Sequence, residues 1–347
     1  MEMQLPKIGQ GIGLYKWDDT HVSILREGID LGLTMIDTAE SYSHGQTEEM
    51  LSKVIKDIRN KVIISSKFSP EHSRFNEVIK SAEGSLKRLK TDYIDIYYQH
   101  WPSYNVEVEE TMQAMSKLKN NGKIRYIGLS NPSVLNIDKA RKIDTVDFVQ
   151  VEYNLFNRCS DRDIVPYCKN HNIQIVAYSP LDQGKVTDTS GNTLLNPLLQ
   201  KYKKTKFQIA LNWIVSKNII PIPKASNVLH LRENAASLSF KMSDEDIKYI
   251  DNNLSSCIEM IDTKNIEVLS KSTDNRPICT TLQDAISNTA NYSPSPNEIS
   301  QHLSSNILPV KLIKEEDKYF LIEGRSRFWA WIIKYGYDYP IPALIRR

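Results

Sequence analysis

The feature that most constrains the fold is a repeated alternation of short apolar segments with helical segments over residues 1–260. Each apolar segment is short and nearly continuous, as expected for a strand buried on both faces. Each is followed by a stretch whose apolar residues recur at helical spacing. Strands are expected at Lys7–Leu14, Thr34–Ile36, Val62–Ser66, Ile94–Gln99, Ile124–Leu129, Phe148–Glu152, Ile173–Tyr178 and Ile219–Pro221. Eight such units predict a closed parallel barrel with a helical coat, the (β/α)8 TIM barrel.

A doubly wound open sheet is the alternative. Such a sheet usually begins with a GxGxxG turn that leads into a helix, whereas Gly9, Gly11 and Gly13 alternate within the first strand itself. The barrel is therefore preferred. Its first helix is expected to begin at Asp18 or Asp19, and a long loop is expected over Pro180–Thr205.

The alternation stops after a short capped helix at Ser243–Asn253, and Asn288–Asn297 is rich in loop-forming residues. A strand at Lys318–Leu321, a turn at Glu323-Gly324, an apolar helix at Arg325–Tyr335 and a closing edge strand at Pro340–Ile345 follow. The helix is too apolar to lie free in solvent. The sequence therefore predicts two domains, a barrel over residues 1–260 and a small α+β domain over residues 261–347.

Composition excludes several functions. The formal net charge is +2, from 44 basic and 42 acidic residues, which gives no general attraction to nucleic acid or to a membrane surface. No run of about 18 apolar residues and no signal-peptide pattern is present. The four cysteines form neither a CxxC pair nor a zinc pattern with the histidines. We expect a cytoplasmic protein with no metal, no disulfide and no membrane or nucleic-acid partner.

Polar residues collect where the predicted strands end. Taken alone, Asp37 and Tyr42 need no explanation beyond a solvated carboxylate and an exposed ring. In a parallel barrel, however, the carboxyl ends of all strands meet at one mouth, where active sites lie. The polar residues at these ends are Asp37, Lys67, His100, Ser130, Asn131, Gln150, Tyr178 and Lys224. A full ring of them favours a functional site.

Three of these residues, Asp37, Lys67 and His100, together with Tyr42 suit the reduction of a carbonyl group. A lysine beside Tyr42 stabilises the phenolate and should bring the pKa of the tyrosine toward working pH, and Asp37 can hold Lys67 in place. A neutral His100 can donate a hydrogen bond to a carbonyl oxygen as hydride arrives at the carbon. Besides these, Asn131 and Gln150 offer amides suited to a carboxamide, and the ring of Tyr178 suits stacking on a flat heterocycle.

These residues occur in motifs that resemble the aldo-keto reductase family over about residues 5–255. The motifs are Ile36-Asp37-Thr38-Ala39 with Tyr42, Ser66-Lys67, Gln99-His100-Trp101-Pro102, Ile127 to Asn131, Val149 to Asn154, Tyr178-Ser179-Pro180-Leu181 and Ile222 to Ser226. The resemblance implies a catalytic set of Asp37, Tyr42, Lys67 and His100, with Tyr42 as proton donor. It also implies an NADP(H) site made of Ser130, Asn131, Gln150, Tyr178, Ser179, Leu181, Lys224, Ser226, His230 and Asn234.

One departure from the family pattern concerns the adenosine end of the cofactor. Relatives that use NADPH commonly carry an Arg four residues before the Asn, and that position is His230 here, with Arg232 two residues late. Lys224 remains in place to meet a 2′-phosphate, and Asn234 can hold adenine. NADPH is therefore favoured over NADH.

The C-terminal domain resembles the ParB/sulfiredoxin-like fold over its last 45 or so residues, from Ile307-Leu308-Pro309-Val310 through Tyr319–Arg327 to Pro340-Ile341-Pro342. The resemblance implies that Gly324, Arg325 and Arg327 bind a nucleotide phosphate. Arginines in the first turn of a helix oppose its dipole, and a bound anion would offset that cost. The alternative is two solvated arginines beside Glu323.

The leading hypothesis is an enzyme that reduces an aldehyde or ketone with NADPH, with the C-terminal domain covering the active site or binding a nucleotide. One alternative is a nucleotide-binding or phosphotransfer protein that acts through the C-terminal domain and uses the barrel as a redox sensor. Another is a non-catalytic subunit that binds the cofactor, although the complete catalytic set argues against it. No stretch of the sequence selects a particular substrate.

Overall fold

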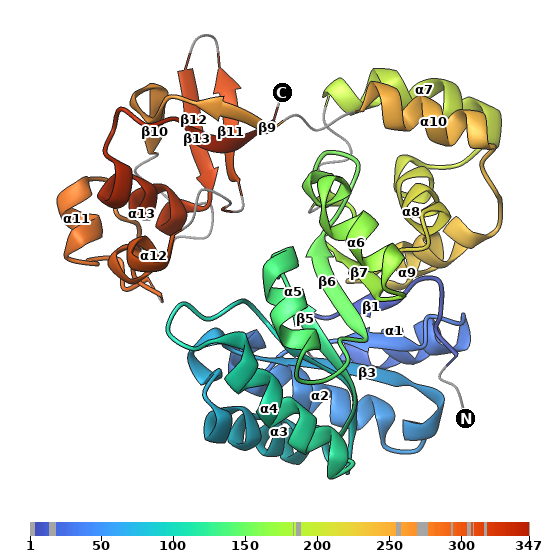
Figure 1. Ribbon diagram of the computed structural model, residues 1–347. Helices are drawn as coiled ribbons and strands as arrows, with labels where there is room; N and C mark the ends of the chain where they lie inside the picture. Colours follow the sequence, from blue (N-terminus) through green and yellow to red (C-terminus); the bar gives the residue numbers. More distant parts are fainter. Residues whose placement is uncertain are drawn as a thin grey trace. The chain divides into compact units, whose positions relative to one another are not determined.

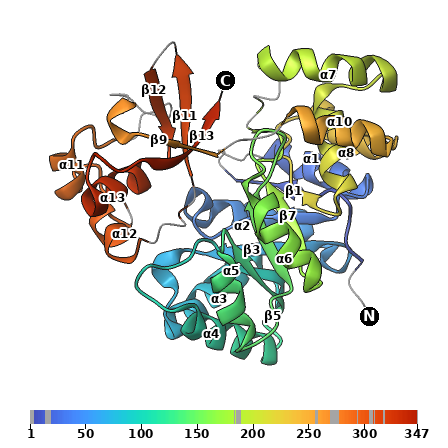
Figure 2. The same ribbon diagram turned by 45° about the horizontal axis from the view of Figure 1, so that its top comes forward.

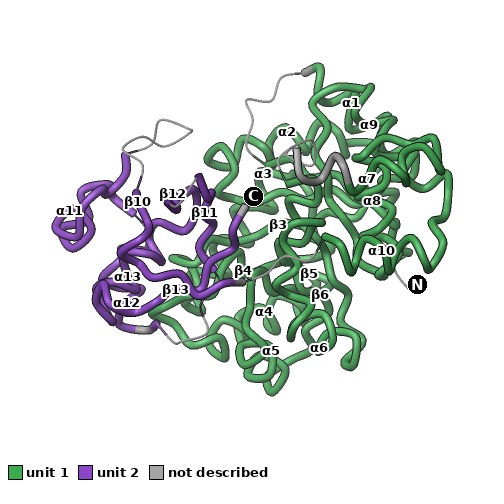
Figure 3. The backbone as a smooth tube through the Cα atoms, turned by 90° about the horizontal axis from the view of Figure 1, so that it is seen from above, with its two compact units in different colours: residues 1–255 green, residues 256–347 purple. Residues whose placement is uncertain are grey.

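The computed structural model describes residues 4–13, 19–182, 184, 189–254, 258–268, 277–292, 294–303, 307, 309–315 and 318–346. Leu14, Asp18, Leu308 and part of the expected loop after Pro180 lie outside the described residues. The chain divides into two compact units, Met1–Ser255 and Ser256–Arg347, which Figure 3 colours separately. Ile258–Ile261 falls in the second unit because it pairs with a strand there.

The first unit contains an eight-stranded parallel sheet whose strands follow one another in chain order (Figure 1). The strands are β1 (Gln10–Gly11), β2 (Met35–Asp37), β3 (Ile63–Phe68), β4 (Ile94–Gln99), β5 (Ile124–Ser130), β6 (Phe148–Glu152), β7 (Gln174–Tyr178) and β8 (Ile220–Pro221). Backbone bonds from Gly9 N to Pro221 O (2.9 Å) and from Gly11 N to Pro223 O (3.1 Å) join the first strand to the last. This closure confirms the barrel over the doubly wound sheet.

The glycines of the first strand make this closure possible. A Cβ atom at Gly11 would lie 2.7 Å from the backbone oxygen of Ile222, and one at Gly9 would lie 3.0 Å from that residue's side chain. Contacts this close to backbone leave no room for a larger residue. The alternating glycines therefore serve the contact between β1 and β8.

Helices surround the strands. They are α1 (Asp19–Asp30), α2 (Gln46–Ile55), α3 (Phe75–Leu89), α4 (Val108–Asn120), α5 (Val134–Arg141), α6 (Ile164–Asn170), α7 (Thr189–Tyr202), α8 (Lys206–Ser216), α9 (Val228–Ala235) and α10 (Asp244–Asn253). The expectation of a long loop over Pro180–Thr205 was wrong, because the helix α7 occupies much of this range. Leu195 and Leu198 of α7 are buried, whereas Pro197 within the helix and Gly191 made the segment resemble a loop.

Two apolar layers stabilise the barrel. One fills its interior and contains Met35, Ile63, Ile96, Phe148 and Val176. The other lies between the strands and the helical coat. Because side chains alternate along a strand, Asp37, Ser65, Lys67 and Gln150 share the inward face with these interior residues. The fold therefore directs a polar layer into the barrel at the carboxyl ends of its strands.

The second unit contains a five-stranded mixed sheet of order β10-β12-β11-β13-β9. The strands are β9 (Ile258–Ile261), β10 (Ile266–Val268), β11 (Val310–Glu315), β12 (Lys318–Glu323) and β13 (Ile341–Arg346). The expectation that β13 is an edge strand was wrong, because it pairs with β11 on one side and with β9 on the other. Sequence periodicity does not reveal the partners of a strand, and β9 lies far from β13 in the chain.

Three helices pack with this sheet, α11 (Leu282–Ile286), α12 (Pro296–His302) and α13 (Arg325–Tyr335) (Figure 2). As expected, α13 is not free in solvent: Phe328, Trp329 and Trp331 are buried, and Trp329 Nε1 donates to Cys279 O at 3.0 Å. The resemblance of this unit to the ParB/sulfiredoxin-like fold stays a prediction. Over the described ranges of both units, every helix is too short or too polar to cross a membrane.

Candidate active site

The side chains of Asp37, Lys67 and Tyr42 meet at the ends of β2 and β3. Lys67 Nζ donates to Asp37 Oδ1 at 2.5 Å and to Thr38 O at 2.7 Å, and it also bonds the hydroxyl of Tyr42. The three N–H groups of this fully buried ammonium therefore all have partners. Burial lowers the pKa of Lys67, but Asp37 and Tyr42 together raise it further, so the ammonium stays charged.

The pKa of Tyr42 differs from the sequence expectation. Burial raises the pKa of Tyr42, and Lys67 lowers it by less, so the pKa lies above its ordinary value instead of below it. The sequence indicates the neighbouring cation but not the extent to which the hydroxyl is removed from water. Tyr42 is therefore protonated at neutral pH in this structure.

His100 follows the last residue of β4, and its ring meets that of Tyr42 edge to face with a centroid distance of 5.6 Å. Burial and the charge of Lys67 lower the pKa of His100 to about 3. The ring is therefore neutral at physiological pH and carries one N–H donor. Its Nδ1 lies 3.5 Å from Ser41 Oγ.

The second carboxylate oxygen of Asp37 has two donors that the sequence did not reveal. Ser65 Oγ donates to Asp37 Oδ2 at 2.7 Å, and Gln150 Nε2 donates to the same atom at 2.8 Å. Ser65 lies two residues before Lys67 on β3, so strand alternation could have placed it on the same face. The bond from Gln150 crosses the barrel and could not be read from spacing.

The four rim residues expected near a carboxamide do lie together. Asn131 has a left-handed backbone (φ 56°), and its N–H donates to Gln150 O at 2.8 Å. Its side chain donates to Ser130 Oγ at 3.1 Å and accepts from Tyr178 Oη at 2.9 Å. These bonds hold the amide of Asn131 beside the ring of Tyr178.

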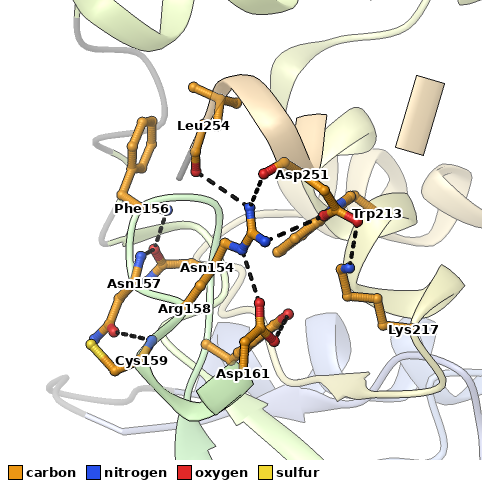
Figure 4. A network of polar contacts seen from close by, with 11 residues as sticks. Asn154, Phe156, Asn157, Arg158, Cys159, Asp161, Trp213, Lys217, Asp251 and Leu254 are labelled. Atoms are coloured by element: carbon orange, nitrogen blue, oxygen red, sulfur yellow. Dashed lines mark hydrogen bonds and ion pairs between the residues drawn. The ribbon is translucent and has the colours of Figure 1, made fainter. Parts of the chain in front are cut away.

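Ser179, which follows β7, also has a left-handed backbone (φ 47°), and the side chain of Asn154 fixes it. Asn154 Nδ2 donates to Ser179 O at 3.1 Å. Asn154 Oδ1 accepts from the backbone N–H of Phe156 and of Asn157 (Figure 4). Asn154 is completely buried. The sequence motif contained Asn154, but its connection to Ser179 was missed.

The segment after β6 is also tied to the end of the barrel. Arg158 Nε donates to Asp161 Oδ2 at 3.0 Å, and its Nη1 donates to the backbone oxygen of Asp251 at 3.0 Å (Figure 4). Asp251 in turn accepts from Trp213 Nε1 and Lys217 Nζ, both at 2.9 Å. This network joins the loop that carries Asn154 to α8 and α10.

The residues expected at the adenosine end lie around α9, together with Ser226 before it. Burial lowers the pKa of Lys224 to about 7. Asn227 caps α9 by accepting from His230 N at 2.9 Å, and the His230 side chain is exposed. Arg232 pairs with Glu27 of α1 at 2.6 Å, which holds its guanidinium on the helical coat. Asn234 is buried, and Leu181 is half-buried in the loop after β7.

The short turn that carries Tyr42 (η1, Tyr42–Gly45) contains three consecutive left-handed residues, Ser43, His44 and Gly45. Such a backbone is costly for residues other than glycine and persists only where its surroundings hold it. Behind it, the fully buried Glu48 accepts from Ser66 Oγ at 2.5 Å and from Arg88 Nε at 2.7 Å. Sequence reasoning missed this support.

In the second unit, the residues expected to bind an anion lie at the start of α13. Gly324 is the N-cap with φ 91°, and no side chain caps the helix. The Nε atoms of Arg325 and Arg327 are buried, and neither has a hydrogen-bond partner in the part of the chain that the structure describes. Arg325 Nη1 lies 3.4 Å from Ile322 O.

Comparison with known proteins places the first unit among reductases. Residues 8–254 match the Aldo/keto reductase family. Over 261 residues the chain is 35% identical to methylglyoxal reductase YeaE of Escherichia coli K12. The aligned region covers 72% of this chain and 91% of that protein. The chain is 31% identical over 252 residues to glyoxal reductase of Bacillus subtilis, with coverages of 72% and 89%. A crystal structure of an aldo/keto reductase from Klebsiella pneumoniae with NADP and acetate superposes with a TM-score of 0.67 at 33% identity, covering 72% of this chain and 91% of that one.

Proposed function

Since this chain belongs to the aldo/keto reductase family, we propose that its barrel reduces a small aldehyde or ketone with NADPH, with Tyr42 as the proton donor. As a member of the family the protein is an NAD(P)H-dependent oxidoreductase, and NADP(H) is its favoured cofactor. The observation that carries the proposal is the buried Lys67 ammonium, which joins Asp37 to Tyr42.

When bound, NADPH would supply the hydride that adds to the carbonyl carbon of the substrate. The carbonyl oxygen, which gains negative charge as the hydride arrives, would take the proton of the Tyr42 hydroxyl. Because the pKa of Tyr42 is raised, this hydroxyl is protonated before the reaction. Lys67 then stabilises the phenolate, and Asp37 keeps the ammonium in place. The neutral ring of His100 donates its N–H to the same oxygen and orients it.

The donors of the barrel rim support the choice of cofactor. Ser130, Asn131 and Gln150 would hold the carboxamide, and Tyr178 would stack on the nicotinamide ring. Ser179 and Leu181 would line the pyrophosphate. Lys224 would meet the 2′-phosphate, and Ser226, His230 and Asn234 would hold the adenosine. The hydrogen bonds among Ser130, Asn131, Gln150 and Tyr178 support one carboxamide site, because they already gather amide groups and an aromatic ring.

The two relatives named for methylglyoxal and glyoxal suggest where to begin with substrates. We propose 2-oxoaldehydes as the first class to test. In such molecules the second carbonyl withdraws electrons from the reacting carbon, which favours hydride transfer.

The proposed chemistry is tested by Tyr42→Phe, which removes only the hydroxyl. Carbonyl reduction should fall by at least about a hundredfold, since general-acid catalysis contributes that much. The Kd for NADPH, measured by fluorescence, should change by less than about threefold. A matched control is Tyr93→Phe, because the Tyr93 ring lies between Arg59 and Arg125 before β4, at the opposite end of that strand. Unchanged turnover in Tyr42→Phe would refute the mechanism.

A second candidate function concerns the second unit. We propose that Gly324, Arg325 and Arg327 bind a nucleotide phosphate, in keeping with the ParB/sulfiredoxin resemblance. The two buried Nε atoms without partners among the described residues favour it. The unit would then accompany the reductase as an accessory domain, or act as a nucleotide-binding or phosphotransfer module with the barrel as redox sensor.

The full chain, saturated with NADP, should bind ATP or CTP in calorimetric titrations, and the double variant Arg325→Ala/Arg327→Ala should abolish this binding. Absence of binding at millimolar nucleotide would refute the proposed nucleotide site in the second unit.

A further inference from the structure

Thr47, in the first turn of α2, is a buried polar residue with no role in the reaction proposed above. The residue is fully buried, and its hydroxyl makes two hydrogen bonds to the segment between β2 and the turn η1. Thr47 Oγ1 donates to the backbone oxygen of Tyr42 at 3.3 Å, and it lies 2.9 Å from Thr38 Oγ1. One buried side chain therefore contacts both ends of the short segment that carries Tyr42.

The directions of these two bonds follow from the donors available. A threonine hydroxyl has one proton, and Thr47 gives it to the carbonyl of Tyr42. The bond between the two hydroxyls must then be donated by Thr38, which is also fully buried. The result is a chain of hydrogen bonds that runs from Thr38 through Thr47 to the backbone of Tyr42.

The same Thr38 is joined to Lys67. Its backbone oxygen accepts from Lys67 Nζ at 2.7 Å, and the ammonium also bonds the Tyr42 hydroxyl. Thr38 and Thr47 therefore connect the backbone of Tyr42 to the cation that its side chain meets. This connection fixes the backbone of Tyr42 relative to the ammonium, so the hydroxyl is held within hydrogen-bonding reach of it.

The turn after Tyr42 makes such a connection necessary. Ser43, His44 and Gly45 are left-handed, with φ of 48°, 54° and 85°. A left-handed backbone is costly for a serine or a histidine, so this turn would relax if nothing held it. The bond from Thr47 to Tyr42 O spans these three residues and joins the residue before them to the helix after them.

We propose that Thr47 is a positioning residue for the reductase: its hydroxyl holds the backbone of Tyr42 so that the phenol meets both Lys67 and the carbonyl oxygen of the substrate. This inference rests on the proposed role of Tyr42 as proton donor. Because Thr47 is fully buried, it acts through Tyr42 and has no contact with substrate or cofactor. Its loss should therefore affect the chemical step and leave binding nearly unchanged.

The test is Thr47→Val, which keeps the shape of the side chain and replaces the hydroxyl by a methyl group. The kcat for reduction of methylglyoxal or nitrobenzaldehyde with NADPH should fall about tenfold, because a displaced proton donor transfers its proton less readily. The KM for the aldehyde and the Kd for NADPH should each change by less than about threefold. Thr47→Ser keeps the hydroxyl and should restore kcat to within about threefold of the wild-type value.

Thr111→Val separates positioning from the general cost of losing a buried hydroxyl. Thr111, in α4, is also fully buried, and its hydroxyl donates to the backbone oxygen of Ser73 at 2.8 Å. This variant should lose a comparable amount of stability in urea unfolding but should keep kcat within about threefold of the wild-type value. Thr47→Ala, which adds no atoms, replaces Thr47→Val if the valine variant does not fold.

A kcat within about threefold of the wild-type value in folded Thr47→Val or Thr47→Ala would overturn the inference while the reductase function stands. So would a tenfold fall of kcat in Thr111→Val, a loss that appears in KM or Kd instead of kcat, or a Thr47→Ser variant as slow as Thr47→Val. Absence of carbonyl reduction by the wild-type protein would overturn the proposed function together with the inference.

Discussion

Arg88 lies so close to Gly45 that a Cβ atom added to the glycine would approach Arg88 Cδ to 2.6 Å. Arg88 also bonds the buried Glu48, which accepts from Ser66 on β3. The turn that follows Tyr42 is therefore packed directly against the ion pair that ties α2 to α3. This contact gives the position of Tyr42 a physical basis outside the proposed catalytic set.

Gly45→Ala should therefore lower both stability and reductase activity. The substitution adds the clash with Arg88 to the strain of a left-handed alanine (φ 85°), for a total of roughly 2–3 kcal/mol. The matched control is Gly32→Ala, which has a similar φ of 90° and nothing within 4 Å of the added carbon, so it should lose only about 1 kcal/mol. Urea unfolding measures both. Equal losses in the two variants would show that Arg88 does not restrain the turn.

Stability should fall in acid partly because of His100. Its pKa is about 3 in the folded protein, against about 6.5 in the unfolded chain. Between these pH values the imidazole of His100 is protonated in the unfolded state and neutral in the folded state. The free energy of unfolding therefore decreases as pH falls from 6.5 toward 3. The loss amounts to about 2 kcal/mol at pH 5. His100→Gln should lose about that much less than the wild type between pH 7.5 and pH 5 in urea unfolding. Parallel losses would contradict a neutral buried ring.

The affinity for NADPH should weaken as pH rises above 7. Burial lowers the pKa of Lys224 to about 7, so the ammonium proposed to meet the 2′-phosphate loses its charge in this range. The Kd for NADPH should rise about tenfold between pH 7 and pH 8.5, whereas the Kd for NADH should not. Lys224→Met should weaken NADPH binding at pH 7 and remove the pH dependence. A pH-independent NADPH affinity in the wild type would argue that another group meets the phosphate.

Asn154→Asp should affect cofactor binding more than catalysis. The change keeps the shape of the side chain and its acceptor for Phe156 N and Asn157 N, but it removes the donor to Ser179 O. The left-handed Ser179 would lose its support, so KM for NADPH should rise about tenfold while kcat changes by less than about threefold. Asn253→Asp is the control, because its amide also donates to a backbone oxygen but is exposed. A fall in kcat alone would contradict the positioning role.

Local patterns predicted much of the barrel. Strand β4 at Ile94–Gln99 and strand β6 at Phe148–Glu152 agree with expectation residue for residue, because buried parallel strands are short apolar runs with clear ends. The helix α7 was missed because a proline and a glycine in its sequence outweighed a short run of leucines. In the second unit, the interior position of β13 depends on β9, a partner that no local pattern reveals.

In the candidate site, too, local sequence patterns predicted some features, whereas others depend on contacts between distant parts of the chain. Strand ends and spacing were enough to bring Asp37, Lys67 and His100 together as candidates. The contact of Gln150 with Asp37 crosses the barrel between strands that are not neighbours in the sheet, so it required the closed ring. The pKa of Tyr42 depended on burial, which the sequence does not quantify. Contacts across the barrel and removal from water are thus the two quantities that only the three-dimensional structure supplies.

The hydrogen bonds from Gly9 and Gly11 to Pro221 and Pro223 have a consequence for how the molecule is made. A nascent chain that emerges from the ribosome carries its first strand long before the eighth exists, so one side of that strand must wait for its partner. Contacts between distant parts of a chain form slowly. Until Pro223 is synthesised, the first strand and the last strand formed so far are unpaired edges of an open sheet. The polar residues that would bind the cofactor are then not yet held in a closed ring. Acquisition of cofactor affinity should therefore be a late event in biosynthesis.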